Sequence, residues 1–381
     1  MARAIWHLDS HTAAVTPSRP RRLSSVRFLH TLIALTLLSA CTATSLAVAR
    51  PSTAPGSAVP ATCAARTTPA IEWRVSDGAD ALELSRWCRA VGAPVYVGAP
   101  AVPATEIPTL DELVTVSWNA HLAEGELRDL IAKLRSGALT NGRPVSHFVL
   151  LVQELYRRGD EVPAFDAGDR SAFAIRPRDP KAFDIDDHAS ALGLSMLYVP
   201  SMRNGPELRE DRGNAIISTE PLLDPFALEL PLARQRRVAL GAAVQVQTID
   251  GPKRLELIDA HLEPLSSPKT LWVFKNPRAG QVRAILEVLD TPRYSDDAVA
   301  GVVLGGDFNT VRYGADEDAY HLARAWSHSL AREDARDTHM MGRLDYLFFR
   351  SKSGWTASTQ RLDERFGSDH YPVVGTFSLG Q

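Results

Sequence analysis

From Leu113 to the end of the chain, short apolar runs alternate with polar turns, and this pattern restricts the fold more than any other feature. The apolar runs have the length of buried strands, while stretches with apolar residues every three or four positions are typical of helices. Some predicted strands follow each other directly and others are separated by a helix, which predicts layered α/β architecture with mixed sheets. The predicted strands are 113–118, 147–153, 195–199, 214–218, 238–247, 254–261, 301–306, 344–349 and 372–378, and the predicted helices are 124–135, 186–193, 278–290 and 318–331.

Polar side chains occur close to the ends of these strands, where a rigid element holds them and solvent still reaches them. Taken singly, most have an ordinary structural explanation, such as a turn, a helix cap or a solvated strand end. Asp345 is harder to explain in this way, because an ionised carboxylate inside a strand needs a partner. The residues concerned are Asn119, Glu154, His261, Asp307, Asn309, Asp345, Asp369 and His370.

As a set, these two histidines, four carboxylates and two asparagines supply what metal-assisted phosphoester hydrolysis requires. Sites rich in oxygen and poor in nitrogen favour Mg²⁺ or Mn²⁺ over zinc. The set also contains no cysteine, which is a frequent zinc ligand. The expected cofactor is therefore Mg²⁺ (or Mn²⁺).

The order of these motifs resembles the endonuclease/exonuclease/phosphatase superfamily over about residues 113–379. The resemblance implies a four-layer α/β sandwich, in which two mixed β-sheets pack face to face and helices flank them. It also implies a metal-dependent phosphoester hydrolase. The motifs that carry the resemblance are Trp118-Asn119, Gln153-Glu154, Gly213-Asn214-Ala215-Ile216, Asp259-Ala260-His261, Gly306-Asp307-Phe308-Asn309, Leu344-Asp345-Tyr346 and Ser368-Asp369-His370.

The resemblance assigns a metal site and a general base. Glu154 would be the principal metal ligand, with Asn119 and Asp369 close to the ion. His370 would accept a proton from the attacking water, and Asp345 would fix the tautomer of His370. Adjacent residues of an extended chain point in opposite directions, so Asp369 is poorly placed to orient His370 itself.

The remaining matched residues would act on the phosphate. Asp307 and Asn309 would orient the water and bind a non-bridging oxygen. His261 would stabilise charge on the phosphate or protonate the leaving oxygen. The presence of His261 makes the chain similar to the branch with secreted DNases, sphingomyelinases and inositol-phosphate phosphatases, but the sequence does not assign an acidic partner to this histidine.

The substrate class stays open between two kinds of phosphoester. One interpretation is a phosphodiesterase or nuclease that acts on nucleic acid. The other is a phosphatase or phospholipase C-type enzyme that acts on a phospholipid head group or a small phosphoester, for which the apolar segment 271–274 would be a contact. A third, non-catalytic interpretation is a binding lipoprotein on the same fold. Asn214, Arg212 and Arg236 are candidate phosphate-binding residues, although a single loop arginine is usually only solvated.

The N-terminal segment predicts export. An arginine-rich stretch precedes the apolar run 28–40, which is too short to span a bilayer. This run ends in Leu38-Ser39-Ala40-Cys41, which resembles the lipobox of bacterial lipoproteins and would make Cys41 a lipid anchor. Without residues 1–40 the chain holds 37 basic and 44 acidic side chains, a net charge of −7 that does not favour polyanions through bulk charge alone. We expect a protein anchored in the bacterial cell envelope.

These features predict four segments. Residues 1–40 form a lipoprotein signal peptide, and residues 41–62, rich in Ala, Pro, Ser and Thr, form a flexible tether. Residues 63–104 form an N-terminal extension stapled by a disulfide between Cys63 and Cys88, because disulfides persist in exported proteins. Residues 105–381 form the catalytic domain.

Overall fold

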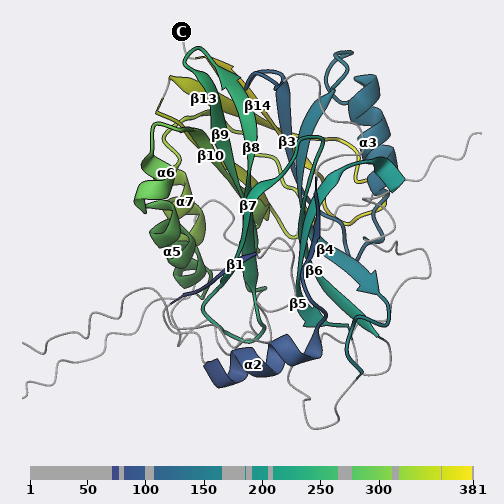
Figure 1. Ribbon diagram of the computed structural model, residues 1–381. Coiled ribbons are helices and arrows are strands. Elements are labelled where there is room, and N and C mark those ends of the chain that lie inside the picture. The colour runs from purple at the N-terminus through teal and green to yellow at the C-terminus, as the bar shows by residue number, and fades with distance from the viewer. Residues whose placement is uncertain are drawn as a thin grey trace, which may run out of the picture. The chain divides into compact units, whose positions relative to one another are not determined.

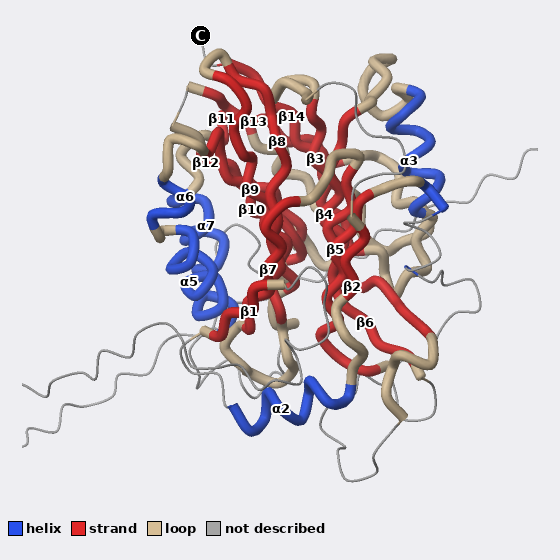
Figure 2. Tube along the Cα trace, viewed as in Figure 1, coloured by secondary structure: helices blue, strands red, loops and turns tan. Residues whose placement is uncertain are grey.

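The computed structural model describes residues 71–76, 81–98, 107–164, 185, 191–204, 209–264, 277–310, 317–352 and 354–379 of the 381-residue chain. The chain divides into residues 1–52 and residues 53–381, and every described residue belongs to the second unit. Two β-sheets make up most of this unit (Figures 1 and 2).

The first sheet has six strands in the order β1-β7-β8-β9-β10-β12. Strand β9 pairs with β10 in parallel, and β10 pairs with β12 in an antiparallel arrangement, so the sheet is mixed. Its strands are β1 (Glu72–Val75), β7 (Leu223–Glu229), β8 (Val238–Thr248), β9 (Gly251–His261), β10 (Val299–Asp307) and β12 (Asp345–Arg350).

The second sheet has eight strands in the order β11-β13-β14-β3-β4-β6-β5-β2. It is also mixed, because β3 and β4 are parallel while β4 and β6 are antiparallel. Its strands are β11 (Leu330–Arg332), β13 (Trp355–Arg361), β14 (Val373–Leu379), β3 (Leu113–Asn119), β4 (His147–Arg158), β6 (Glu210–Ser218), β5 (Ser195–Arg203) and β2 (Val95–Val97).

The two sheets pack face to face, with β3 against β10, β4 against β9 and β6 against β8. Strand β4 shows how the sequence produces this packing: Val149 and Leu151 join the core between the sheets, while Phe148 and Leu150 face the opposite way. Because alternate side chains enter different cores, the strand reads as one continuous apolar run.

Helices cover the outer faces of the two sheets (Figure 1). On the eight-stranded sheet, α3 buries Leu127, Leu130, Ile131 and Leu134, whose spacing puts them on one face of the helix. On the other side, α5, α6 and α7 lie outside the six-stranded sheet. The predicted four-layer sandwich is therefore confirmed. The helices are α2 (Ala81–Ala90), α3 (Leu127–Ser136), α5 (Pro277–Leu289), α6 (Pro292–Ser295) and α7 (Asp318–Trp326).

All nine predicted strands are present, and the sequence pattern missed β1, β2, β7, β11 and β13. Strand β7 contains an Asp-Pro step and β13 has few apolar residues, so neither has the pattern of a buried strand. The predicted helices 124–135 and 278–290 correspond to α3 and α5. The predicted helix 318–331 ends at Trp326, since β11 follows it, and most of 186–193 lies outside the described residues.

The predicted extension 63–104 is continuous with the catalytic domain where it is described. Strand β1 pairs with β7 at the edge of one sheet, and β2 pairs with β5 at the edge of the other. Cys88 is buried on α2, but Cys63 lies outside the described residues, so their disulfide stays a prediction. Cys41, the signal peptide and the tether also lie outside them. Within the described ranges, each helix is too short or too polar to cross a membrane.

Candidate active site

Three candidate catalytic residues lie side by side at one edge of the six-stranded sheet. Asp307, the last residue of β10, is in register with His261 at the end of β9 and with Asp345 at the start of β12. Gly306 lets β10 approach β9 this closely: its φ is +139°, and a Cβ there would lie 1.8 Å from the carbonyl oxygen of Ala260. The Gly-Asp step therefore sets the position of Asp307 by backbone geometry.

Two further residues come from the eight-stranded sheet. Asn119, at the end of β3, is in register with Gln153 on β4. Glu154 follows at a point where the pairing of β4 with β6 shifts between Val152 and Leu155, and its φ is +58°. Successive side chains of a regular strand point to opposite faces of the sheet, and a bulge of this kind turns one side chain away from that pattern. The strained backbone thus aims Glu154 toward the catalytic edge.

Side-chain contacts join the two sheets at this edge. Asn119 Nδ2 donates to Asp307 Oδ2 at 2.9 Å and to Glu154 Oε1 at 3.4 Å. His261 Nε2 lies 3.5 Å from Asp307 Oδ2 and 3.9 Å from Glu154 Oε1. The carboxylates nearest to His261 in the described chain are therefore those of Asp307 and Glu154. Because Asn119 Oδ1 accepts the His121 backbone N–H, the amide nitrogen of Asn119 faces the carboxylates, so this amide positions Glu154 and Asp307.

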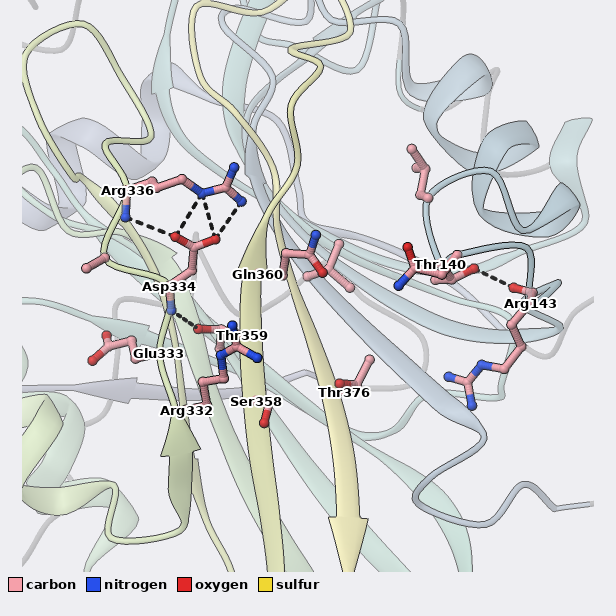
Figure 3. A pocket seen from close by; sticks show the side chains of 14 residues that line it. Thr140, Arg143, Arg332, Glu333, Asp334, Arg336, Ser358, Thr359, Gln360 and Thr376 are labelled. Atoms are coloured by element: carbon pink, nitrogen blue, oxygen red, sulfur yellow. Dashed lines mark hydrogen bonds and ion pairs between the residues drawn. The ribbon is translucent and has the colours of Figure 1, made fainter.

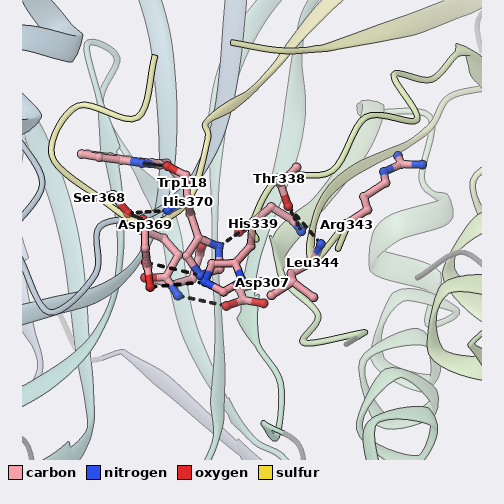
Figure 4. A network of polar contacts seen from close by, with 12 residues as sticks. Trp118, Asp307, Thr338, His339, Arg343, Leu344, Ser368, Asp369 and His370 are labelled. Atoms are coloured by element: carbon pink, nitrogen blue, oxygen red, sulfur yellow. Dashed lines mark hydrogen bonds and ion pairs between the residues drawn. The ribbon is translucent and has the colours of Figure 1, made fainter. Parts of the chain in front are cut away.

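The loop before β14 supplies the second histidine (Figure 4). His370 Nδ1 is 2.8 Å from Asp345 Oδ2, and the His370 backbone N–H donates to Ser368 Oγ at 3.0 Å. Ser368 Oγ in turn donates to the carbonyl oxygen of Asn119 at 2.7 Å, and Trp118 Nε1 donates to the carbonyl oxygen of His370 at 3.3 Å. The loop is therefore tied to both sheets, and the imidazole of His370 is held in one orientation.

Burial and neighbouring charges change the protonation of these groups. Burial disfavours the charged imidazole of His370, but Asp345, Asp307 and Asp369 outweigh this effect and raise its pKa to about 10. Burial and the charge of Asp345 raise the pKa of Asp307 to about 7. Burial, together with Arg237 and Arg212, holds the pKa of His261 well below its usual value. Perturbation of this kind is typical of functional sites.

The carboxylates fit a hard divalent cation. Burial opposes ionisation of Glu154, but Arg212, His370 and Arg237 outweigh it and lower the pKa of this carboxyl. Asp369 is likewise ionised, because His121, His370 and His339 overcome the effect of burial on its pKa. Potential ligand atoms lie within 4.8 Å of one another in two described groups, His339-Asp369-His370 and Asp307-Asp345-His370. Ionised carboxylate oxygens are the preferred ligands of Mg²⁺ and Mn²⁺.

This geometry agrees with a family assignment made on the sequence. The model of the endonuclease/exonuclease/phosphatase family matches residues 116–370, a span that runs from β3 to the catalytic loop. The chain belongs to this family. No protein with curated function matches it.

Several solved structures resemble the chain at low sequence identity. The human Nocturnin catalytic domain with bound sulfate is 16% identical, covers 75% of this chain and 96% of its own, and has a TM-score of 0.44. Sphingomyelinase C from Streptomyces griseocarneus is 15% identical, with 69% and 98% covered and a TM-score of 0.39. A mannosyl-6-phosphatase from Bacteroides thetaiotaomicron is 14% identical, with 70% and 99% covered and a TM-score of 0.43.

In this member of the family, two histidines that the sequence reasoning missed hold Asp369. His121 Nδ1 lies 2.9 Å from Asp369 Oδ1, and His339 Nε2 lies 3.3 Å from Asp369 Oδ2. His339 Nδ1 accepts the backbone N–H of Met341, which places the proton of a neutral His339 on the nitrogen that faces Asp369. His121 is only two positions after Asn119, which was a usable signal, whereas nothing in the pattern around His339 indicates its place.

The predicted phosphate-binding residues differ in what they contact. Asn214 Nδ2 donates to the Val238 carbonyl at 3.3 Å, which links β6 to β8. Arg212 is half-buried and lies close enough to Glu154 to influence its pKa. Arg236 does not fit the prediction, because its guanidinium is bound by the Glu229 carboxylate and by two backbone carbonyls. Its neighbour Arg237 lies close enough to Glu154 and Asp307 for their charges to act on its pKa.

A pocket of about 710 Å³ in the described chain lies away from this cluster (Figure 3). It is lined by residues of β13 and β14, by the segment from Arg332 to Arg336 and by the loop after α3. Its acidic residue Asp334 is bound by Arg336 at 2.6 Å, and no histidine lines it. We therefore place the candidate active site at the residue cluster.

Proposed function

We propose that the protein is a divalent-metal-dependent phosphoester hydrolase in which His370 activates the attacking water. The observation that carries the proposal is the Asp345–His370 contact of 2.8 Å beside the ionised carboxylates of Glu154 and Asp369. A histidine oriented by a buried carboxylate is the usual form of a general base. The bound Mg²⁺ or Mn²⁺ would neutralise charge on the phosphate and, through its own charge, favour the neutral form of His370.

Different residues act on the attacking water and on the leaving oxygen. As the water oxygen attacks phosphorus, a proton of the water passes to His370 Nε2, since Nδ1 is occupied by Asp345. The bond between phosphorus and the leaving oxygen breaks. His261 is neutral because of its lowered pKa, so it serves the departing or non-bridging oxygen as a hydrogen-bond donor, and the leaving oxygen takes its proton from solvent. Asp307, held by Asn119, supports the water.

The arginine contacts support a small phosphoester over a long nucleic acid. Arg203 and Arg209 donate to backbone carbonyls, while Arg236 and Arg278 pair with buried carboxylates. Arg203, Arg236 and Arg278 are buried inside the fold, so these three do not contribute to a basic groove for a polyanion, whereas Arg209 is exposed. The apolar segment 271–274, which would contact a lipid, lies outside the described residues.

A substrate panel tests the proposal. The purified protein is assayed on plasmid DNA, RNA, sphingomyelin, a phosphoinositide, p-nitrophenyl phosphate and bis-p-nitrophenyl phosphate, with and without Mg²⁺. We expect hydrolysis of at least one phosphoester, its loss with EDTA and its recovery with Mg²⁺ or Mn²⁺. Undiminished hydrolysis after metal removal would contradict the proposal. An unchanged biological effect of His370→Ala would favour the non-catalytic binding lipoprotein instead.

We also propose that Cys41 anchors the protein in the bacterial cell envelope, as the lipobox pattern indicates. Cys41→Ser should move the protein from the membrane fraction to the soluble fraction, and the wild-type protein should incorporate labelled fatty acid. Incorporation into the Cys41→Ser variant would contradict this assignment. The variant retains the whole catalytic domain, so its specific activity should be unchanged.

A further inference from the structure

Arg237 is buried without a carboxylate in direct contact with it among the described residues. Its side chain precedes β8 and is 5% exposed. In the described part of the chain, no carboxylate oxygen lies within 4.0 Å of its guanidinium, whose hydrogen bond runs from Nη2 to the amide oxygen of Gln235 at 3.1 Å. The buried Nε has no partner among the described residues. An unbalanced charge in the interior is costly, because burial removes its hydration.

Five other arginines are buried in the described part of the chain, and one of them, Arg203, donates to the carbonyl oxygen of Pro163. Each of the other four binds a carboxylate directly, and each of these carboxylates is itself largely buried. The pairs are Arg157–Asp211, Arg236–Glu229, Arg278–Glu317 and Arg343–Glu333. In these four cases the fold supplies the counter-charge by direct contact from its own chain, whereas no carboxylate of the described chain contacts Arg237 directly.

Arg237 lies next to the catalytic edge, two positions before Ala239 of β8, which is in register with Ala260, the neighbour of His261 on β9. Burial lowers the pKa of Arg237 to about 10; Glu263, Glu154 and Asp307 act on it with attraction and Arg212 with repulsion. Both arginines in turn lower the pKa of Glu154 and of His261. Two guanidinium groups thus lie around the same carboxylate and imidazole, although their mutual repulsion disfavours this arrangement in the free protein.

An anion next to His261 would offset both the burial of the Arg237 charge and the repulsion between Arg237 and Arg212, because it would pair with the two guanidinium groups at once. Together with the divalent cation at Glu154, they would present three separate positive groups to one phosphate. A phosphate monoester has three non-bridging oxygens and two negative charges, whereas a diester has two such oxygens and one charge. The number of cationic groups matches the monoester.

We propose that Arg237 and Arg212 bind the terminal phosphate of the substrate, and that the preferred substrate is a phosphate monoester. This inference rests on the proposed hydrolase function and narrows it to a phosphatase. The two arginines do not select the organic group on the other side of the ester oxygen. The rest of the site would contact that group.

The test compares Arg237→Met and Arg212→Met with Arg234→Gln, a matched control at an exposed arginine just before β8. Two readouts are kinetic: kcat/KM on p-nitrophenyl phosphate and on bis-p-nitrophenyl phosphate, both with saturating Mg²⁺. Two readouts do not depend on turnover: calorimetric binding of inorganic phosphate to the Mg²⁺-loaded protein, and the thermal midpoint of the protein without phosphate.

We expect the wild-type protein to favour the monoester by at least about tenfold. Arg237→Met should lower kcat/KM for the monoester and the affinity for inorganic phosphate by about 10- to 100-fold, with a much smaller effect on the diester. Its thermal midpoint without phosphate should equal or exceed that of the wild-type protein, because an unbalanced buried charge is removed. The Arg234→Gln control should match the wild-type protein in every readout.

The outcomes separate this inference from the proposed function. Phosphate binding that depends on Arg237, in a protein that hydrolyses no ester, would support the arginine site and contradict the hydrolase. Hydrolysis with unchanged phosphate affinity in both arginine variants would overturn the arginine site alone. A preference for the diester, retained in Arg237→Met, would overturn the monoester assignment. A lower thermal midpoint with unchanged phosphate affinity would make Arg237 a structural residue.

Discussion

Asp345 Oδ2 lies 2.8 Å from His370 Nδ1, although the two residues are separated by 25 positions; Asp345 begins β12 of the six-stranded sheet, and His370 lies in the loop before β14 of the eight-stranded sheet. The contact is fully buried at Asp345, whose side chain is 0% exposed. The backbone N–H of Asp345 donates to Thr338 Oγ1 at 3.0 Å, which fixes the start of β12. The pair leaves Nε2 as the nitrogen of His370 that is open to a substrate water.

Replacing Asp345 by Asn should remove the orientation of this base while keeping the shape of its side chain. The amide can present a donor to Nδ1, which favours the wrong tautomer of His370. We expect kcat to fall by roughly 10²- to 10⁴-fold, with KM nearly unchanged. Steady-state kinetics at saturating Mg²⁺ measure kcat and KM separately.

The matched control for this substitution is Asp363→Asn, an exposed aspartate that pairs with Arg336 and Arg361 on the surface. Surface pairs contribute little to stability, so this variant should retain wild-type kcat. Equal loss of activity in both variants would show that the effect is not specific to the base.

The family resemblance of the motif order implied that Asp345 orients His370, and the 2.8 Å contact agrees with this role. The strand pattern alone indicated only that a carboxylate within an apolar strand needs a partner. The orientation of Asn119 was not predictable, because the backbone N–H of His121 decides which amide atom faces the carboxylates. Arg236 and Arg237 are adjacent and chemically identical, and only their surroundings in the fold distinguish the ion-paired Arg236 from Arg237, on which the charges of Glu154 and Asp307 act.

The left-handed backbone of Glu154 was also beyond the sequence pattern. Glu154 has φ of +58° because one register shift between β4 and β6 places it in a bulge. The side chains of a continuous apolar strand alternate in the same way before and after such a shift. The sequence pattern therefore does not show where the shift occurs. The identity of this residue was thus predictable from motif order, but the geometry that aims it was not.

Glu154→Gln should weaken binding of the divalent cation more than it changes the fold. The amide keeps the size of the side chain but removes the negative charge, which is the strongest attraction for Mg²⁺. We expect the Mg²⁺ concentration for half-maximal activity to rise by at least about 100-fold. The thermal shift that Mg²⁺ produces in the wild-type protein should also disappear, which is a readout independent of turnover.

The control for the metal site is Glu161→Gln, an exposed carboxylate seven positions further along the chain. Its Mg²⁺ response should match that of the wild-type protein. A wild-type thermal shift in Glu154→Gln would show that the cation binds elsewhere.

The metal-free protein should lose stability as the pH rises, and His370 should be one cause. Its folded-state pKa of about 10 lies above the ordinary value of 6.5. The stabilisation by the Asp345–His370 pair is therefore complete below about pH 6.5 and is lost as the pH rises through about 10. At 1.36 kcal/mol per pKa unit, the loss is at most about 5 kcal/mol.

Urea unfolding in EDTA, at intervals from pH 6 to pH 10, measures this effect against His370→Gln. The difference in unfolding free energy between the two proteins should shrink as the pH rises. Asp307 also lowers the unfolding free energy as the pH rises, because its raised pKa means that folding favours its protonated form. A difference that is constant over this range would show that His370 is not charged in the folded metal-free protein.

The last prediction concerns two glycines with opposite roles, Gly306 and Gly280. At Gly306 the φ of +139° and the 1.8 Å approach to the Ala260 carbonyl leave no room for a Cβ, so Gly306→Ala must separate β10 from β9. We expect a loss of about 3 kcal/mol in unfolding free energy. Because Asp307 would move with the strand, activity should also fall by about 100-fold.

At Gly280, within α5, a Cβ would meet no atom within 4 Å. Gly280→Ala should therefore raise the unfolding free energy by about 0.5–1 kcal/mol, because alanine favours a helix more than glycine does. Its activity should equal that of the wild-type protein. Urea unfolding of both variants, with kinetics on the substrate found in the panel, tests the pair. If both variants changed stability in the same direction, the close contact of β10 with β9 would not be what positions Asp307.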